Sequence, residues 1–330
     1  MRYLLHESDH PISTDYYYEC RKTTNDHFPR VLAHTHDYYE IYIYLSGSVM
    51  LFIEDRIYKV KRGDIIVIPP YTIHQLLPTS EEQLNDEYDR TYMYITPACL
   101  SSFQFNEHSL LEPFELAKEN KRYHFNIADS DDFERIFQCF MGIYQNSKID
   151  FYGKEMLNRA HILEAVTLLN KHILLDMKPR KATHVNPFID KVLSYINEHY
   201  KEDLSLEQLA GHFYLNKFTL AKLFKEQTDR TVHNYIILKR ISMAKQKITE
   251  GVLPSAVYQD VGFRDYSTFY RAFLKMEKIS PKERVPAHGH HFEYLECKYK
   301  EMISFSSSPL ERKKRKIICK CKPKSKIFLC

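Results

Sequence analysis

The chain of 330 residues has no tryptophan, only eight glycines and no long apolar run. A membrane-spanning helix needs about 20 consecutive, mostly apolar residues, and no stretch approaches that length. The amino terminus, MRYLLHESDHPIS, also lacks the apolar core of a secretory signal. We therefore expect a cytoplasmic protein with no membrane partner.

The seven cysteines are odd in number and form no CxxC pair, which favours a reducing compartment over a disulfide framework. Cys20, Cys99 and Cys139 are scattered, as small buried apolar residues are. The cysteines near the carboxyl terminus lack His or acidic partners at zinc-finger spacing. Nothing in the sequence resembles a nucleophilic triad, a phosphate-binding glycine loop or a four-cysteine zinc module, so these chemistries are not expected.

Charge is distributed unevenly along the chain. Residues 1–186 carry 20 Lys+Arg against 27 Asp+Glu, residues 187–287 carry 16 against 12, and residues 288–330 carry 11 against 4. Positive charge therefore collects in the carboxy-terminal half, as a polyanionic partner such as nucleic acid requires.

The stretch Leu204 to Val285 contains one short pattern twice, LSLEQLAGHFYLNKFTLAKLFKEQT and PSAVYQDVGFRDYSTFYRAFLKMEK. Its apolar positions recur at a spacing of 48 or 49 residues, as Leu209 and Phe224 show when compared with Val257 and Phe273. Each copy predicts two short helices joined by a tight turn, and the second helix has polar, aromatic and basic outward positions. This is the arrangement of a helix-turn-helix, repeated in tandem.

These residues resemble the AraC/XylS family of bacterial transcription regulators. The matching motifs are Leu206-x-x-Leu209-Ala210, Leu220-x-Lys222-x-Phe224-Lys225, Arg240-Ile241-x-x-Ala244-Lys245, Val261-Gly262-Phe263-x-Asp265-x-Ser267-x-Phe269-x-Arg271-x-Phe273 and Ile279-Ser280-Pro281. The resemblance implies a connecting helix over about 231–250. It also implies two recognition helices that enter successive major grooves, about 34 Å apart, on one face of the duplex.

Carried over position by position, the resemblance implies a DNA-contacting set on the two recognition helices. Its members are Lys217, Phe218, Ala221, Lys222 and Lys225 in the first, and Tyr266, Ser267, Tyr270 and Arg271 in the second. Arg271 is the expected guanine contact, because its planar fork can bond O6 and N7 together. The lysines are expected to meet phosphates, which position the protein without reading sequence.

Several positions depart from the family pattern. Tyr214, Asp229 and Lys278 stand where the family usually has glycine, and Tyr258 replaces a usual small residue. A non-glycine residue held at positive φ costs on the order of 1 kcal/mol. We therefore expect strain in the turns rather than a different fold.

The amino-terminal part alternates apolar and polar residues between Val31 and His74, with turn signals at Ser46-Gly47, Glu54-Asp55 and Arg62-Gly63. This pattern predicts antiparallel strands that close into a small β-barrel. Further strands are expected at 16–21, 75–77, 90–95 and 123–126.

The spacing His34-x-His36-x-x-x-Glu40, with His74 further on, resembles the two cupin motifs. AraC-type barrels usually hold a small organic ligand, so the preferred interpretation is an effector pocket. Its expected residues are His34, His36, Glu40, Tyr42 and His74, supported by the rings of Tyr16, Tyr18, Tyr38 and Tyr44. The alternative is a divalent metal at His34, His36, Glu40 and His74, because three imidazoles and one carboxylate suit a first-row ion. No other cofactor is expected.

Between Ser130 and Met177 the apolar residues return to helical spacing and predict two helices. One stripe would pack on the barrel and a second on a twin subunit, which predicts a homodimer. The alternative is that both stripes are used within one subunit. The following DMKPRKATHVNP has no apolar period and predicts a flexible linker.

The expected fold is α+β and multidomain: a cupin-like β-barrel, a helical connector and an all-α tandem helix-turn-helix domain. The expected boundaries are 1–128 for the barrel, 129–178 for the connector, 179–187 for the linker, 188–287 for the DNA-binding domain and 288–330 for a basic tail. The expected function is sequence-specific transcription regulation in response to a small metabolite, such as a carbohydrate. Expected partners are double-stranded DNA, the effector, a second subunit and, for an activator, RNA polymerase. The alternative is a metal-dependent cupin isomerase or oxygenase fused to a DNA-binding module.

Overall fold

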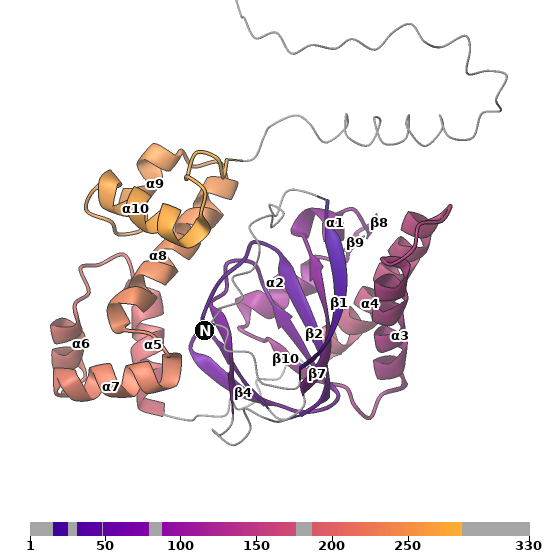
Figure 1. Cartoon of the computed structure of the whole chain (residues 1–330), viewed down its shortest axis with the longest axis horizontal. Coiled ribbons are helices and arrows are strands. Elements are labelled where there is room, and N and C mark those ends of the chain that lie inside the picture. The colour runs from indigo at the N-terminus through magenta and orange to yellow at the C-terminus, as the bar shows by residue number, and fades with distance from the viewer. Residues whose placement is uncertain (1–15, 26–31, 48, 79–87, 176–186, 286–330) are drawn as a thin grey trace, which may run out of the picture. The chain divides into compact units, whose positions relative to one another are not determined.

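The computed structural model describes residues 16–25, 32–47, 49–78, 88–175 and 187–285. The described residues up to 175 form a β-rich region with four helices, and residues 187–285 form a helical region (Figure 1). Most of the predicted linker, and the whole basic tail, lie outside the described residues. Across the described ranges, no helix combines the length and apolar character needed to span a bilayer.

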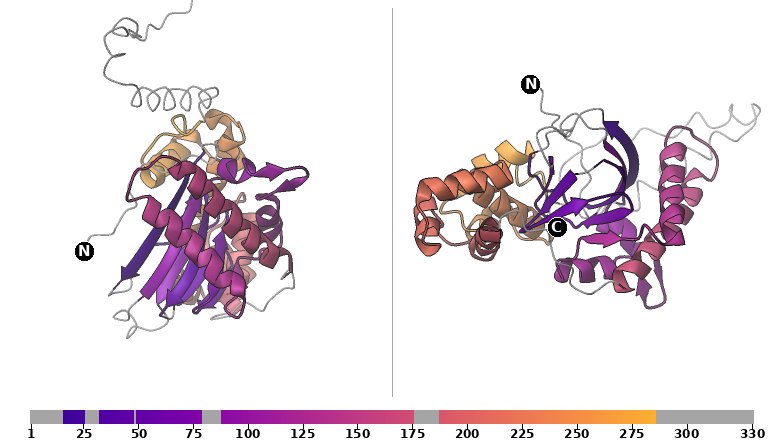
Figure 2. Two further views of the ribbon diagram at one scale, coloured as in Figure 1. Left: turned by 90° about the vertical axis from the view of Figure 1, so that its right-hand side faces the viewer. Right: turned by 90° about the horizontal axis from the view of Figure 1, so that it is seen from below.

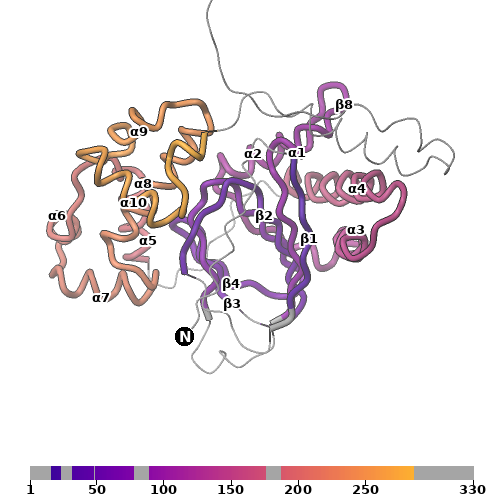
Figure 3. Tube along the Cα trace, turned by 45° about the horizontal axis from the view of Figure 1, so that its top comes forward, coloured from indigo at the N-terminus to yellow at the C-terminus, as the bar shows by residue number. Residues whose placement is uncertain are grey.

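Each strand pairing among the described residues of the β-rich region is antiparallel, as the alternating pattern predicted. A five-stranded sheet has the order β1-β7-β2-β5-β10, a three-stranded sheet has the order β4-β3-β6, and β8 pairs with β9. The strands are β1 (Tyr18–Asn25), β2 (Tyr39–Ser46), β3 (Val49–Ile53), β4 (Arg56–Val60), β5 (Asp64–Ile68), β6 (His74–Pro78), β7 (Tyr88–Ile95), β8 (Gln104–Phe105), β9 (His108–Ser109) and β10 (His124–Asn126). The first two sheets curve around a shared interior (Figure 3).

Strand β2 shows why the two faces of the large sheet differ. Tyr39, Ile41 and Ile43 belong to a core shared with the helices, whereas Tyr44 belongs to a separate core inside the barrel. Successive side chains of a strand point to opposite faces, so Glu40 and Tyr42 share the inward face with Tyr44. The sequence alternation therefore places polar chemistry inside the barrel and apolar packing outside it.

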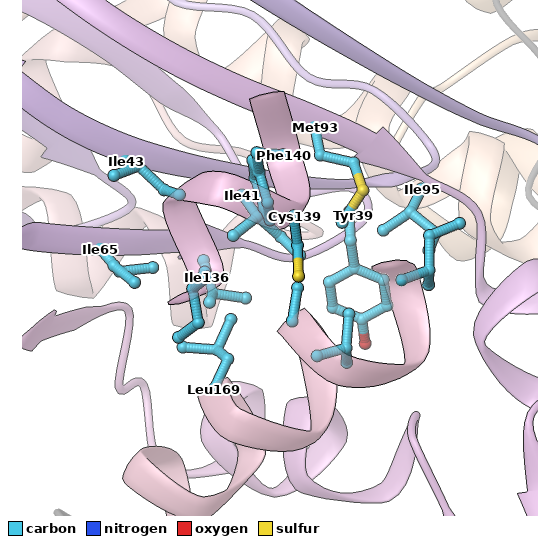
Figure 4. Packing of buried hydrophobic residues seen from close by; sticks show 14 of the residues in the cluster. Tyr39, Ile41, Ile43, Ile65, Met93, Ile95, Ile136, Cys139, Phe140 and Leu169 are labelled. Atoms are coloured by element: carbon cyan, nitrogen blue, oxygen red, sulfur yellow. The ribbon is translucent and has the colours of Figure 1, made fainter. Parts of the chain in front are cut away.

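Two helices cover the outer face of the large sheet, α3 (Asp131–Asn146) and α4 (Lys154–Leu175) (Figure 2). Ser130 caps α3 by accepting a hydrogen bond from the backbone N–H of Asp132 at 3.2 Å. Phe140 of α3 and Leu169 of α4 pack against Ile41 of β2 in this core (Figure 4). Two shorter helices, α1 (Pro97–Ser101) and α2 (Glu112–Glu119), complete the region.

The helical region contains the two predicted bihelical units and the helix between them. Its helices are α5 (Pro187–His199), α6 (Leu206–His212), α7 (Lys217–Thr228), α8 (Val232–Thr249), α9 (Pro254–Asp260) and α10 (Tyr266–Glu277). Leu209, Leu220 and Phe224 are fully buried in the first unit, as Val257 and Phe273 are in the second.

Helix α8 belongs to both cores of the helical region. Its first half contributes Val232 and Tyr235 to the core of the first unit, and its second half contributes Ala244 and Ile248 to that of the second. Thr231 caps its start by accepting from the N–H of Asn234, so the predicted connecting helix is confirmed. One continuous helix thus fixes the two units to each other.

The turns adopt the strained conformation that the sequence predicted. Tyr214, Asp229 and Lys278, which replace the usual glycines, have φ of 53°, 53° and 62°. Asp229 and Lys278 end α7 and α10 as left-handed caps. Tyr258 lies inside α9, where no such conformation is required.

Candidate DNA-binding surface and effector site

Helix α7 presents the first predicted DNA-contacting set. Asn216 caps the helix by accepting from the N–H of Phe218 at 2.8 Å. The ring of Phe218 is 73% exposed on this helix. Lys217, Lys222 and Lys225 are exposed beside it, and Ala221 is half-buried.

Helix α10 presents the second set. Asp265 caps it by accepting from the N–H of Thr268 at 2.8 Å, and that bond lowers the pKa of the Asp265 carboxyl. Tyr266, Ser267, Tyr270 and Arg271 are all exposed, whereas Phe269 and Phe273 on the opposite side are fully buried. The Arg271 Nε donates to the backbone oxygen of Ser267 at 3.3 Å, which directs the guanidinium along the helix surface.

Some basic side chains in these sets have acidic neighbours. Lys217 lies 3.0 Å from Glu207, and Lys222 lies 3.9 Å from Glu226. Exposed ion pairs contribute about 0–1 kcal/mol, so a DNA phosphate can compete for these ammonium groups. The structure thus exposes the predicted residues on one side of each recognition helix, and their contacts with DNA stay a prediction.

The predicted histidine and glutamate cluster forms inside the barrel. The Nε2 atoms of His36 and His74 lie 3.2 Å and 3.4 Å from the same oxygen, Oε2 of Glu40. All three residues are buried, with exposed fractions of 6%, 2% and 2% for His36, Glu40 and His74. The ring of His34 lies beside them, with its centroid 4.3 Å from that of His74. Residues from two separate stretches of sequence, 34–40 and the region of His74, therefore meet, as the cupin-like spacing predicted.

Burial and neighbouring groups shift the pKa values of Glu40, His34 and His36 in this cluster. Burial lowers the pKa of His36, although Glu40 opposes the shift, and burial next to His74 lowers the pKa of His34 strongly. Burial opposes ionisation of Glu40, but the two neighbouring histidines outweigh it and hold the pKa of its carboxyl well below the usual value. Glu40 is therefore favoured as a carboxylate, whereas burial disfavours the charged form of His34 and of His36.

A cluster of tyrosines lines the same interior. Tyr38, Tyr92 and Tyr94 form a buried group in which Tyr38 and Tyr94 have ring centroids 4.8 Å apart. Tyr42 joins it through Tyr92 at 5.4 Å, and the Arg90 guanidinium lies 5.4 Å from the centroid of the Tyr92 ring. The sequence interpretation missed Tyr92, Tyr94 and Arg90, whose alternation along β7 shows only that they share one face of the strand.

Two tyrosines assigned to the pocket from sequence lie elsewhere. Tyr18 donates to Glu155 of α4 at 2.6 Å, and Arg159 of α4 donates to the hydroxyl of Tyr16 at 2.6 Å. Both rings pack against the core between the sheet and the helices. The prediction was wrong because, at this edge of the sheet, Tyr17 packs against the tyrosines of the barrel interior, whereas Tyr16 and Tyr18 lie on the opposite face.

Comparison with known proteins gives the same division of the chain. Residues 16–169 match the model of the AraC-like ligand binding domain, and residues 209–284 match that of a helix-turn-helix domain. The probable transcriptional regulator LumQ of Photobacterium leiognathi is 31% identical over 131 residues, which are 39% of this chain and 52% of LumQ. The match therefore spans about half the length of that relative.

Two further similarities cover more of the chain. The arabinose operon regulatory protein of Escherichia coli (strain K12) is 25% identical over 252 residues, 74% of this chain and 79% of that protein. Among solved structures, ToxT from Vibrio cholerae strain SCE256 aligns with 82% of this chain and 96% of its own, at 13% identity and a TM-score of 0.35.

Proposed function

Because the chain belongs to the AraC family of DNA-binding transcription regulators and has the ligand-binding domain of that family, we propose that a small polar metabolite of the carbohydrate class controls it. The metabolite binds inside the barrel and changes the affinity of the two helix-turn-helix units for DNA. The chain is a regulator rather than an enzyme, since its relatives are named transcriptional regulators.

The lining of the barrel carries this proposal. Tyr38, Tyr92 and Tyr94 supply aromatic faces with hydroxyl tips, and Glu40 and His36 supply charge and hydrogen-bonding groups on the same inward face. Sugars combine apolar C–H faces with many hydroxyls, so a lining that mixes tyrosine rings with polar groups suits them. The name of one relative, the arabinose operon regulatory protein, supports the same class.

On the DNA side, we assign base contacts to Phe218, Ala221 and Lys222 of α7 and to Tyr266, Ser267, Tyr270 and Arg271 of α10. Lys217 and Lys225 contact phosphates, together with Lys222. The continuous α8 supports simultaneous binding, because it belongs to the cores of both units and limits their relative movement. Two helices held in this way suit two adjacent major-groove segments on one face of DNA.

Helix α4 supports a homodimer. Its residues Val166, Leu169 and Ile173 are buried within the subunit, whereas Met156, Leu157 and Leu163 are 74%, 43% and 48% exposed. An exposed apolar stripe on a regular helix favours pairing with a second copy. A dimer brings four helix-turn-helix units to one operator in the cytoplasm, and RNA polymerase is a further partner where the bound regulator activates transcription.

The test begins with sequencing of genomic DNA that the purified protein retains, which defines the operator. Operator affinity is then titrated with a panel of mono- and disaccharides, for wild type and for Tyr94→Ala. We expect one sugar class to change the affinity of wild type at least fivefold and that of the variant much less. Affinity that no sugar changes would instead indicate regulation through protein abundance alone.

A further inference from the structure

Hydrogen bonds fix the ring orientation of both histidines that face Glu40. The Nδ1 atom of His36 lies 2.8 Å from the backbone oxygen of Tyr38, and that of His74 lies 3.0 Å from the backbone oxygen of Thr72. A carbonyl oxygen only accepts hydrogen bonds, so each Nδ1 carries a proton. In the neutral form of such a ring, Nε2 carries no proton and presents a lone pair.

Both of these Nε2 atoms are directed at an oxygen that also presents lone pairs. They lie 3.2 Å and 3.4 Å from Oε2 of Glu40. Among the described residues, the His74 Nε2 has no hydrogen-bond partner although it is buried. Lone pairs that face one another repel, and a buried polar atom without a partner is costly. A cation between the three groups removes this conflict, and so does a second proton on each ring.

The spacing of the groups fits a cation. Two ligands at about 2.1 Å from a metal are about 3.0 Å apart at octahedral angles and about 3.4 Å apart at tetrahedral angles. The two Nε2–Oε2 separations, 3.2 Å and 3.4 Å, match this range. One ligand atom from each of His36, Glu40 and His74 lies within 4.8 Å of the others, so small side-chain shifts bring all three to one ion.

We propose that His36, Glu40 and His74 bind one divalent first-row transition-metal ion inside the barrel. Imidazole nitrogens with one carboxylate favour Zn²⁺, Co²⁺, Ni²⁺ or Fe²⁺ over Mg²⁺ and Ca²⁺, which prefer oxygen ligands. The carbonyls of Tyr38 and Thr72 are the outer partners that hold ligating imidazoles in place. The remaining coordination positions of the ion are open to His34 or to an oxygen of the effector.

The proposal goes beyond the carbohydrate response, because the ion can bind whether or not a sugar does. A metal site also differs measurably from a structural ion pair between Glu40 and the two histidines. An ion pair requires a proton on the Nε2 atom of both His36 and His74, whereas a metal site requires both atoms to be unprotonated.

The experiment uses the full chain, stripped of metal by a chelator and titrated with Co²⁺. We expect one equivalent of Co²⁺ to bind, with visible absorption bands of nitrogen and oxygen coordination, and one equivalent of Zn²⁺ to displace it. Glu40→Gln preserves the size of the side chain but removes its charge, and it should weaken Co²⁺ binding at least 100-fold. His74→Ala should do the same, whereas His108→Ala, at an exposed histidine of the same region, should leave binding unchanged.

Circular dichroism shows whether each variant is folded. If His74→Ala does not fold, the isosteric Glu40→Gln still provides the test. Two results would overturn the proposal. One is Co²⁺ binding by Glu40→Gln as tight as that of wild type. The other is failure of wild type to bind Co²⁺, with protons seen on both Nε2 atoms by nitrogen-15 NMR. Operator binding measured on the same samples separates loss of the metal site from loss of the regulator itself.

Discussion

Tyr214 and Gly262 occupy the same position in the two helix-turn-helix units, 48 residues apart, and both have positive φ, 53° and 88°. Each lies in the turn that leads to a recognition helix. The second unit meets this requirement with glycine, whereas the first forces a bulky side chain into a left-handed conformation. The ring of Tyr214 is 98% exposed, so no packing offsets the strain.

Tyr214→Gly should therefore stabilise the protein. Relief of the left-handed strain is worth about 1–2 kcal/mol, and the greater chain entropy of glycine offsets part of it, which leaves a gain of roughly 0.5–1 kcal/mol. Urea unfolding of both proteins measures the difference. Lys275→Gly, inside α10 and exposed, is the matched control and should cost about 1 kcal/mol. A loss of stability in Tyr214→Gly would show that the turn is not strained.

Gly262→Ala should destabilise the second unit strongly. A Cβ at this position would lie 2.5 Å from the backbone oxygen of Lys201, and the positive φ would remain. Overpacking and backbone strain together predict a loss of about 3 kcal/mol in the free energy of unfolding. Gly211→Ala is the control, because it lies in α6 with open space around it and should be neutral or stabilising by up to about 1 kcal/mol. Equal effects of the two changes would contradict this explanation.

Arg271→Ala should reduce discrimination at one base pair of the operator by about 1–3 kcal/mol. The physical reason is the loss of a bidentate guanidinium contact to guanine, which an alanine cannot replace. Binding titrations against operators with each base substituted in turn measure it. Lys225→Ala gives the contrast, because its proposed contact is a phosphate: affinity should fall for every sequence and the salt dependence should become shallower by about one unit. A uniform loss for Arg271→Ala would reassign that residue to the phosphate backbone.

Asp64 should make the stability of the β-rich region depend on pH. The side chain is fully buried, accepts from Asn126 at 2.6 Å and from the N–H of Lys61 at 2.8 Å, and lies 3.0 Å from His124. Burial alone would raise the pKa of Asp64, but these three partners outweigh it and lower the pKa. A carboxyl with a lowered pKa in the folded state stabilises the protein fully above its unfolded pKa of about 3.9. That contribution disappears as pH falls through the folded-state value.

Asp64→Asn should accordingly cost about 1–3 kcal/mol at pH 7, and the cost should shrink as pH falls below about 4. Urea unfolding of both proteins across this pH range measures the difference. Asp129→Asn, at an exposed carboxylate of the same region, should have little effect at either pH. A difference that stays constant between pH 7 and pH 3 would exclude ionisation of Asp64 as its cause.

Local patterns were sufficient to predict the helices and most strands. The cap at Ser130, the cap at Thr231 and the repeated apolar spacing around Phe224 and Phe273 depend on neighbours within one or two turns of chain, which the sequence shows directly. The turn at Tyr214 was predictable for the same reason, since the two copies can be compared residue by residue.

The lining of the barrel was harder to predict because it depends on pairing between distant strands. Alternation shows that Tyr92 and Tyr94 share a face of β7 but does not show which face is inside. That is decided by the register with β2, in which Tyr42 is opposite Tyr92 and Glu40 is opposite Tyr94. No local signal contains this register, so these residues were missed, and Tyr16 and Tyr18 were assigned to the wrong side.

Neighbouring residues of strand β2 contact different groups on the two faces of the sheet. Glu40 belongs to the polar cluster, while the hydroxyl of the adjacent Tyr39 donates to Glu115 of α2 on the other side of the sheet. A slip of β2 by one residue would turn Glu40 toward the apolar core and Tyr39 toward the polar cluster. The burial of a carboxylate among apolar side chains makes that slip costly. The register of β2 is therefore fixed from both faces of the sheet, by the polar cluster around Glu40 and by the apolar core around Tyr39.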